Sequence, residues 1–399
     1  MYLMHKNKKV LEFDIDRNIY HILDEQMLPY GLRNVFIQYD INMSDEEKIA
    51  VRTNNHVKFI HFLAGRMLTI ERENAKKILN AYHLSQDQTD YNKACIAISC
   101  RAVSMTDCYW INNEQDICWE NIDPKRNHLN DIVAHIALKG SSLTLTGEPH
   151  TPELTGQGAY AKAWQRIDGE TYLLKAAGRY GNEEDIEVCV SKILDCFNVA
   201  HVKYEKDYFE DKPVSKCLNM TSDQYSIVSA EEIFGYCNRT GLDFLQTVLS
   251  IDAESIYKMC IVDYLISNSD RHGKNWGFYV NNDTGKIVSC HPLFDHNNAF
   301  DEEQMADPTG GASLIFYEKN KQEVALYALQ RCVFECIAPV KREIFLSDKM
   351  YQSFMRRAVE LKLYKKNRPT LVQKIGLRAF EEYEPVEIFG MRAEARKGV

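Results

Sequence analysis

The feature that most constrains this chain is an almost wholly apolar stretch that leads directly into a polar loop. The stretch Ile256–Ile266 contains only two charged residues, Lys258 and Asp263, so it predicts a helix buried in the molecule. The loop at residues 267–275 is polar and contains a glycine, and residues 276–290 read as two short strands around a turn rich in Asn, Asp and Gly. We therefore expect a helix, a loop and a β-hairpin in direct succession.

The expected hairpin brings together polar residues that are distant in sequence. Folding about the turn sets Val280 opposite Ile287, and continuing the same register sets Asn275 opposite Pro292. Asp295 then lies just past the residue opposite Asn275. The two side chains are therefore expected to be close in space.

Three polar side chains in this region have the chemistry of a magnesium site. Asp270, Asn275 and Asp295 offer two carboxylates and one carboxamide, all of them hard oxygen ligands. Such a set suits Mg²⁺, which keeps some waters and takes other ligands from phosphate groups. Phosphoryl transfer needs this chemistry, because a carboxylate orients the attacking hydroxyl while the metal neutralises the phosphates.

These residues resemble a known family. Asp-Arg-His-Gly-Lys-Asn at residues 270–275, followed by Phe-Asp at 294–295, is similar to the catalytic and metal-binding loops of the HipA-like serine/threonine kinases. The resemblance implies Asp270 as the catalytic base and Asn275 and Asp295 as metal ligands, with ATP and Mg²⁺ as cofactors. We also expect Lys274 to reach the transferred group. A similar Asp-Arg-His-x-x-Asn run occurs in phosphatidylinositol kinases, so the motif leaves the substrate open. The alternative is that each aspartate only caps a turn.

The resemblance also implies a fold and a division into domains. We expect an α+β chain with a two-lobed, protein-kinase-like fold: a small β-rich lobe with one helix, and a larger helical lobe. The expected boundaries are 1–140 for an N-terminal region of unknown role, 141–232 for the nucleotide-binding lobe, and 233–399 for the catalytic lobe. Residues 143–145, 159–167 and 170–177 are expected to form strands of the small lobe.

A glycine-containing turn precedes these last two strands. Gly156 and Gly158 would allow backbone N–H groups to approach phosphate oxygens without obstruction by a Cβ atom. An ordinary hairpin turn explains the same two glycines. The family resemblance adds that Thr155, in the same turn, is a possible site of autophosphorylation.

A lysine within a predicted strand indicates a buried ion pair. Asp168-Gly169 predicts a two-residue hairpin turn, which sets Lys175 opposite Lys162. A lysine among apolar neighbours loses hydration, so it needs a partner such as nucleotide phosphate and a glutamate, unless its side chain extends to solvent. The following helix, capped by Asn182, offers Glu187 as that partner, although acidic residues in a first turn are common for capping reasons alone.

Two further segments have expected roles that follow from their order along the chain. In kinase-type folds the connector to the larger lobe offers backbone groups to adenine, which favours Ser229 to Glu231 here. Residues 306–313 are dense in Pro and Gly and lie next to the site in sequence. They are expected to form either a mobile segment over the substrate or a surface loop.

Composition limits the classes of partner. The formal net charge of −9 argues against general affinity for nucleic acid or anionic membrane. No stretch has the roughly 20 apolar residues that span a bilayer, and the N-terminus lacks the apolar core of a signal peptide. The twelve cysteines include no Cys-x-x-Cys pair. We expect reduced thiols in a soluble cytoplasmic protein.

These observations favour an ATP-dependent kinase that acts on a Ser or Thr hydroxyl of a protein. A regulatory, antitoxin-like protein partner is an expectation from the family. A lipid or small-molecule kinase is the nearest alternative. Two other classes stay open. One is a metal-dependent phosphohydrolase that uses the histidines of this region, with Asp270, His272, His291, Asp295 and His296 as ligands. The other is an inactive kinase-like binding module that uses the first 140 residues to bind a partner.

Overall fold

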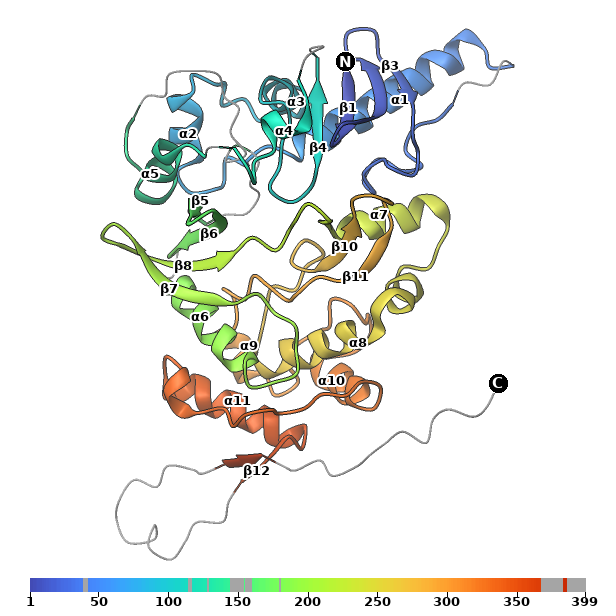
Figure 1. Cartoon of the computed structure of the whole chain (residues 1–399). Helices are drawn as coiled ribbons and strands as arrows, with labels where there is room; N and C mark the ends of the chain where they lie inside the picture. Colours follow the sequence, from blue (N-terminus) through green and yellow to red (C-terminus); the bar gives the residue numbers. More distant parts are fainter. Residues whose placement is uncertain are drawn as a thin grey trace, which may run out of the picture. The chain divides into compact units, whose positions relative to one another are not determined.

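The computed structural model describes residues 1–38, 42–113, 117–127, 129–143, 154, 160–178, 181–366 and 383–385. Helices are mixed with antiparallel sheets throughout this part of the chain (Figure 1). The chain divides into two compact units. Unit 1 comprises Met1–Val188, Val202–Asp252 and His272–Phe294, and unit 2 comprises Cys189–His201, Ala253–Arg271 and Asp295–Val399.

Unit 1 begins with a four-stranded sheet and several helices. The strands run in the order β3-β2-β1-β4, with β1 (Tyr2–His5), β2 (Lys8–Asp14), β3 (Ile19–Ile22) and β4 (Tyr109–Asn112). The helices are α1 (Asp45–Ala64), α2 (Ala75–Ala81), α3 (Asp90–Ser99), α4 (Trp119–Ile122) and α5 (Asp131–Lys139). Ser44 and Glu47 form a capping box at the start of α1, a pattern that is visible in the sequence.

A second antiparallel sheet in unit 1 has the order β5-β6-β8-β7, drawn in green in Figure 1. Its strands are β5 (Lys162–Ile167), β6 (Glu170–Ala176), β7 (Tyr204–Phe209) and β8 (Lys212–Leu218), and α6 (Glu183–Leu194) lies between β6 and β7 in sequence. Asp168 and Gly169 both have positive φ, as the expected two-residue turn requires, and Lys162 pairs with Lys175. The strand β8 was not expected, because Pro213 and two lysines interrupt its apolar pattern. The strand expected at 143–145 lies largely outside the described residues.

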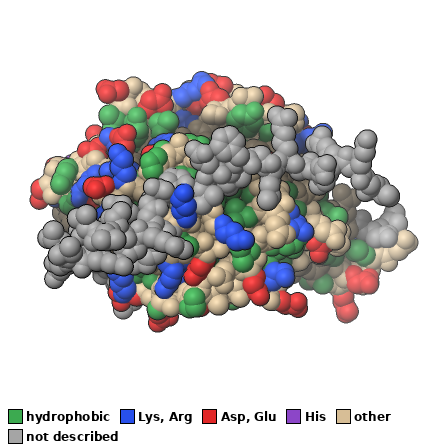
Figure 2. Space-filling model, turned by 90° about the horizontal axis from the view of Figure 1, so that it is seen from below, with side chains coloured by type: hydrophobic (Ala, Val, Ile, Leu, Met, Phe, Trp, Pro, Cys, Tyr) green, Lys and Arg blue, Asp and Glu red, His purple; other side chains and the backbone are tan. Residues whose placement is uncertain are grey.

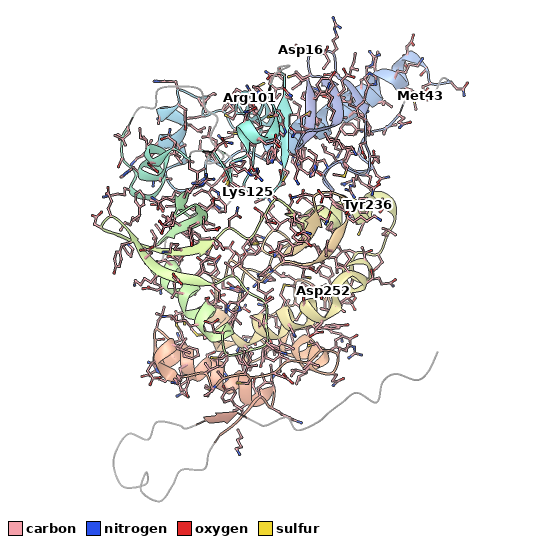
Figure 3. The ribbon with its side chains drawn as sticks, viewed as in Figure 1. Asp16, Met43, Arg101, Lys125, Tyr236 and Asp252 are labelled. Atoms are coloured by element: carbon pink, nitrogen blue, oxygen red, sulfur yellow. The ribbon has the colours of Figure 1, made fainter. Side chains whose placement is uncertain are left out.

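The third sheet of unit 1 carries the hairpin that follows the polar loop. Its order is β11-β10-β9, formed by β9 (Tyr225–Ser229), β10 (Gly277–Asn281) and β11 (Ile287–Cys290). The helix α7 (Ala230–Thr240) follows β9 directly and is capped by Ser229. The next helix, α8 (Phe244–Leu265), is kinked at Asp252, which Figure 3 labels. The Asp252 carboxylate accepts the N–H of Cys290, so the kink and β11 are bonded to each other.

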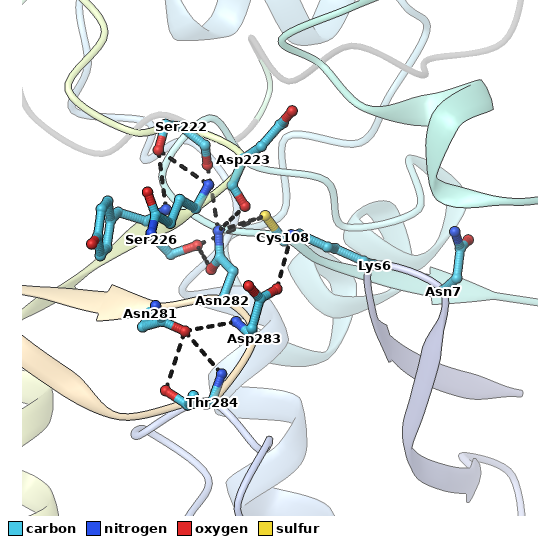
Figure 4. A network of polar contacts seen from close by, with 12 residues as sticks. Lys6, Asn7, Cys108, Ser222, Asp223, Ser226, Asn281, Asn282, Asp283 and Thr284 are labelled. Carbon is cyan, nitrogen blue, oxygen red and sulfur yellow. Dashed lines mark hydrogen bonds and ion pairs between the residues drawn. The ribbon is translucent and has the colours of Figure 1, made fainter.

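Segments from the first 140 residues pack onto this third sheet. The N–H of Ile227 in the edge strand β9 donates to Thr106 O at 2.9 Å. At the β10–β11 turn, the buried Asn282 donates to Cys108 Sγ and accepts from Ser226 Oγ at 2.6 Å (Figure 4). Lys6 lies 3.8 Å from Asp283 in the same turn. The N-terminal region therefore covers the sheet edge and holds the hairpin turn.

Unit 2 is mainly helical. It contains the part of α8 that begins at Ala253, followed by α9 (Glu302–Ala306), α10 (Lys321–Leu329), the 3₁₀ turn η2 (Arg342–Ile344), α11 (Asp348–Glu360), β12 (Tyr364–Lys366) and β13 (Tyr383–Pro385). The fully buried Arg357 donates to the carbonyls of Tyr264 and Asp307, and Asp307 accepts the N–H of Gly311. The loop at residues 306–313 is thus tied to two helices.

Three findings concern the expectations from composition. None of the twelve cysteines forms a disulfide. No helix within the described part of the chain has the length and apolar character needed to cross a membrane. On the face shown in Figure 2, basic and acidic side chains are interspersed. The described residues of this face therefore form no large patch of only positive or only negative charge.

Candidate active site

The buried charge in unit 1 is centred on Lys175. This lysine lies in β6, between β5 and β8, and its side chain is 11% exposed. Its Nζ is 2.6 Å from Oε1 of Glu187, whose side chain is only 1% exposed. The other Glu187 oxygen accepts from Ser215 Oγ at 2.8 Å, and Ser215 pairs with Lys175 across the sheet. The expected pair is therefore present, and its carboxylate is hydrogen-bonded at both oxygens.

The start of α6 explains why Glu187, one turn into the helix, is the partner. Glu183, at the first helical position, accepts the N–H groups of Gly178 and Asn182 at 3.0 and 3.1 Å. It serves as a capping group for the chain that enters the helix. Glu187 is then the buried acidic residue of α6 whose carboxylate contacts Lys175.

The end of α8 shapes the polar loop. Ser267 N–H donates to Tyr264 O, and Asn268 N–H donates to Asp263 O at 3.0 Å. These two bonds form the Schellman motif that ends many helices, in which the residue with positive φ is usually glycine. Here Ser267 has φ 51° and is fully buried. A non-glycine residue in this conformation costs about 1–2 kcal/mol, so the surrounding packing must hold it.

The same loop fixes Asp270 from two sides, within unit 2. Its N–H donates to Asn268 Oδ1 at 3.2 Å, and its Oδ2 accepts from Asn298 Nδ2 at 3.0 Å. The next residue, Arg271, forms a buried pair with Asp263 at 3.0 Å. The Asp270 carboxylate is therefore held by a neutral amide and flanked by fixed neighbours.

The continuation of the loop, in unit 1, places Asn275. Its N–H donates to His272 O, and Glu231 N–H, at the start of α7, donates to Gly273 O; both distances are 2.9 Å. Asn275 is buried. Lys274, by contrast, is 50% exposed and lies 3.5 Å from the Glu231 carboxylate. The loop thus presents one buried amide next to one half-exposed cationic side chain.

The expected register of the hairpin is corrected by a bulge. Val280 pairs with Ile287 as expected, but Tyr279 pairs with Ser289 and Phe278 with Cys290. The extra residue shifts the register by one, as a β-bulge does. The strand β10 also begins at Gly277, so the expected pairing of Asn275 with Pro292 does not form.

Asp295 stands at a second strained position. Its φ is 59°, and Phe300, five residues later, has φ 56°. Phe300 N–H donates to Ile266 O at 2.7 Å, which joins this segment to the end of α8 within unit 2. Strained non-glycine residues persist where the surrounding structure holds them, and they are concentrated at functional sites.

The two units divide the predicted site residues between them. Lys175, Glu187, Lys274 and Asn275 belong to unit 1, whereas Asp270 and Asp295 belong to unit 2. The chain passes between units at Arg271–His272 and at Phe294–Asp295, within both halves of the motif. Gly156 and Gly158 lie outside the described residues, as does Thr155.

Ser229 and Glu231 lie at the beginning of α7. Ser229 forms a capping box with Glu232, and its N–H donates to the Glu232 carboxylate at 3.1 Å. Ala230 N–H donates to Trp276 O, and Glu231 N–H donates to Gly273 O. These three donors are already used. A role of Ser229 and Glu231 in adenine binding stays a prediction, and it would need other groups of this segment.

The donor chemistry fits Mg²⁺ better than a transition metal. Asn275 and Asp295 each offer an oxygen, the donor type that Mg²⁺ prefers alongside phosphate. Among the described residues no group of three His, Cys, Asp or Glu side chains gathers as metal ligands.

Several residues of the site were missed in the sequence. No local sequence pattern indicated Asn298 or Ser215, because their contacts with Asp270 and Glu187 each join residues 28 positions apart. Asp263 had a signal, since a lone carboxylate in an apolar helix needs a buried partner. Lys321, described below, had none.

Comparison with known proteins identifies part of the chain. Residues 212–357 match the family model of the HipA-like C-terminal domain. This segment contains the motif residues from Asp270 to Asp295, so the resemblance expected from them is confirmed. A search of curated proteins found no significant match.

Two solved structures are similar at low identity. The proinflammatory kinase CtkA of Helicobacter pylori is 17% identical, with a TM-score of 0.40, and the match covers 51% of this chain and 88% of that one. HipA of Shewanella oneidensis MR-1, solved with HipB and operator DNA, is 10% identical, with a TM-score of 0.47, and the match covers 90% of this chain and 96% of that one. Because both TM-scores are below 0.5, the assignment rests on the family model.

Proposed function

Because this chain contains a HipA-like C-terminal domain at residues 212–357, we propose that it is a kinase that transfers the γ-phosphoryl group of ATP to a hydroxyl. The proposed acceptor is a Ser or Thr side chain of a protein. The proposed fold is the two-lobed, protein-kinase-like arrangement, with residues 141–232 as the nucleotide-binding lobe and 233–399 as the catalytic lobe. Residues 1–140 form an additional region.

The observation that carries this proposal is the buried pair of Lys175 and Glu187. A buried ion pair is weak evidence for stability, because apolar residues of similar volume often stabilise a fold as well or better. Keeping a lysine in the interior of a sheet therefore points to a use for its charge. The proposed use is to bind nucleotide phosphates, with Glu187 and Ser215 fixing the direction of the ammonium group.

Each further residue has a proposed role in transfer. Asp270 accepts the proton of the attacking hydroxyl, and Asn298 orients its carboxylate. Asn275 and Asp295 hold Mg²⁺, which when bound neutralises charge on the phosphates. Lys274, which is half exposed, reaches the transferred group. Gly156 and Gly158 approach the phosphates through their backbone N–H groups.

The test of the base assignment is Asp270→Asn. We expect phosphoryl transfer to fall by about 10²–10⁴-fold, because the amide cannot accept the hydroxyl proton. The thermal unfolding midpoint should stay unchanged, since an amide can still accept from Asn298. Transfer from labelled ATP to proteins of a cell extract measures the activity. Asp131→Asn, at an exposed position in α5, is the matched control.

The outcomes separate the remaining alternatives. Full activity of Asp270→Asn would remove the base assignment, and absence of any transfer by the wild type would favour an inactive binding module. Label in lipid or in a small molecule would replace the protein acceptor. Label on the chain itself would support autophosphorylation, with Thr155 as the proposed position. An antitoxin-like protein partner and a cytoplasmic location are further proposals from the family.

A further inference from the structure

A buried lysine of unit 2 contacts the loop that carries Asp270. Lys321, the first residue of α10, is 8% exposed. Its Nζ donates to the carbonyl oxygen of Asn268 at 2.7 Å and to Gln304 Oε1 at 2.8 Å. Both acceptors are uncharged, so no carboxylate is bonded to this ammonium group. Burial lowers the pKa of Lys321 below its ordinary value, which reflects the cost of keeping the charge there.

Asn268 is the residue through which this contact reaches Asp270. Its N–H donates to Asp263 O, and its side-chain amide donates to Asp263 Oδ1 at 2.9 Å. Its own Oδ1 accepts the N–H of Asp270. Because Lys321 donates to the Asn268 carbonyl, both the N–H and the C=O of the Asn268 backbone are hydrogen-bonded. The oxygen and the nitrogen of its side-chain amide are hydrogen-bonded as well. The peptide that follows Asn268 therefore has a single hydrogen-bonded orientation.

The space around the contact is almost filled. A cavity of about 20 Å³ lies among residues of this network, which is room for one water molecule. Its lining includes Asp263, Arg271, Ser313 and Lys321. A cavity of this size allows little rearrangement of the lysine, because interiors are close-packed.

We propose that Lys321 is a positioning residue for Asp270 and acts through the carbonyl of Asn268. The inference rests on the proposed function, because it assumes that the place of the Asp270 carboxylate matters for transfer. Ser267, which precedes Asn268, is buried and has a strained backbone. A contact on the other side of the loop is therefore needed to stabilise this backbone conformation. The lysine supplies it from α10. The contact also ties the catalytic loop to the segment before α10, since Lys321 N–H donates to Gly311 O at 2.9 Å.

The experiment compares Lys321→Met with Lys319→Met in the full-length chain. Lys319 is exposed two residues earlier, so the same chemical change there leaves the network intact. For Lys321→Met we expect kcat to fall about tenfold to a hundredfold, the effect of a small misplacement of a catalytic group. The KM for ATP should stay within about twofold, because nucleotide binding is not affected. Equal kcat values for the two variants would overturn the proposal.

Hydrogen exchange gives a readout that does not depend on activity. Amides in the peptide that spans residues 264–272 should exchange at least about tenfold faster in Lys321→Met than in Lys319→Met. If the wild type transfers no phosphoryl group, the proposed function fails, and the exchange result alone decides on the positioning role. Unchanged exchange in this peptide would reject that role.

A second variant covers the case in which Lys321→Met does not fold. Gln304→Leu removes one acceptor of the lysine and leaves its charge and the contact with Asn268 in place. It should lower kcat in the same direction but less, and should again leave the KM for ATP unchanged. A folded Gln304→Leu variant with wild-type kcat and wild-type exchange at residues 264–272 would contradict the proposal.

Discussion

The ammonium group of Lys175 is buried in the sheet, where a carboxylate contacts it in place of water. The Nζ lies 5.4 Å from the centroid of the Tyr204 ring and 2.6 Å from Glu187. Removing only one member of such a pair leaves a buried charge without its partner, which is much more harmful than removing both. Stability and function can therefore be separated at this site by comparing single and double variants.

We predict that Lys175→Met loses both stability and activity, whereas Lys175→Met/Glu187→Leu recovers only stability. The single variant should lose about 3–5 kcal/mol of unfolding free energy, and the double variant should regain most of it. Phosphoryl transfer should stay low in both, because neither can bind phosphate at this position. Urea unfolding and ATP turnover measure the two effects. Wild-type turnover by the double variant would exclude a nucleotide role for Lys175.

Strained backbone is a second feature at the scale of single residues. Ser267, Asp295 and Phe300 all have positive φ without being glycine, and all three lie in the segments that carry the motif or follow it. Each such residue costs of order 1–3 kcal/mol. The packing around Asp295 must therefore hold its backbone in this conformation.

Among the elements, β10 has the closest backbone approach of the described site. A Cβ atom on Gly277 would lie 2.1 Å from the carbonyl oxygen of Val228 in β9. Only glycine allows β9 and β10 to pair at this point, where Gly277 is opposite Ser229. Because Asn275 lies two residues earlier, this close pairing also determines where that amide is placed.

Gly277→Ala should therefore destabilise the protein by about 1–3 kcal/mol through overpacking and should also reduce phosphoryl transfer. The matched control is Gly235→Ala in α7, where the nearest atom to an added Cβ is the end of the flexible Arg239 side chain at 3.1 Å. Alanine in a helix interior is favoured over glycine by about 1 kcal/mol. Chemical unfolding compares the variants, and equal stability of the two would contradict this account of β10.

For the whole of unit 1, the N-terminal region and the hairpin belong to one compact body. The link includes buried His5 in β1, which shares a hydrogen bond with Asn282 of the hairpin turn and whose ring centroid lies 4.9 Å from that of Tyr109. Burial lowers the pKa of His5 from 6.5 to about 4, although Asp107 and Asp283 oppose this and Lys6 adds to it. The unfolded chain therefore binds a proton that the folded chain does not bind between these pKa values.

This linkage predicts a loss of stability in mild acid. The contribution of His5 is complete above pH 6.5 and is lost as the pH falls toward 4. Between about pH 7.5 and about pH 5.5 it should amount to roughly 1 kcal/mol. Urea unfolding of the wild type and of His5→Phe at both pH values tests this. The variant keeps a ring against Tyr109 and should lose that part of the pH dependence; an identical dependence in both proteins would contradict the prediction.

The sequence alone was sufficient where structure depends on neighbouring residues. The Asp168-Gly169 turn set the pairing of Lys162 with Lys175, because a two-residue turn with positive φ permits one register. The capping box at Ser44 and Glu47 is equally local. The predicted register of β10 and β11 was wrong by one residue. The reason is that a bulge depends on packing on both sides of a strand and has no signal in the sequence of the strand itself.

Contacts between distant segments had to come from the folded chain. Asn298 reaches Asp270 across 28 residues and Lys321 reaches Asn268 across 53, and neither spacing has a periodic pattern. The covering of β9 and of the hairpin turn by the first 140 residues is of the same kind. Local chemistry specified the residues proposed to perform phosphoryl transfer, because motif and turn depend on adjacent side chains. Long-range packing selected the neighbours that hold them in place, because many partners are compatible with the same local sequence.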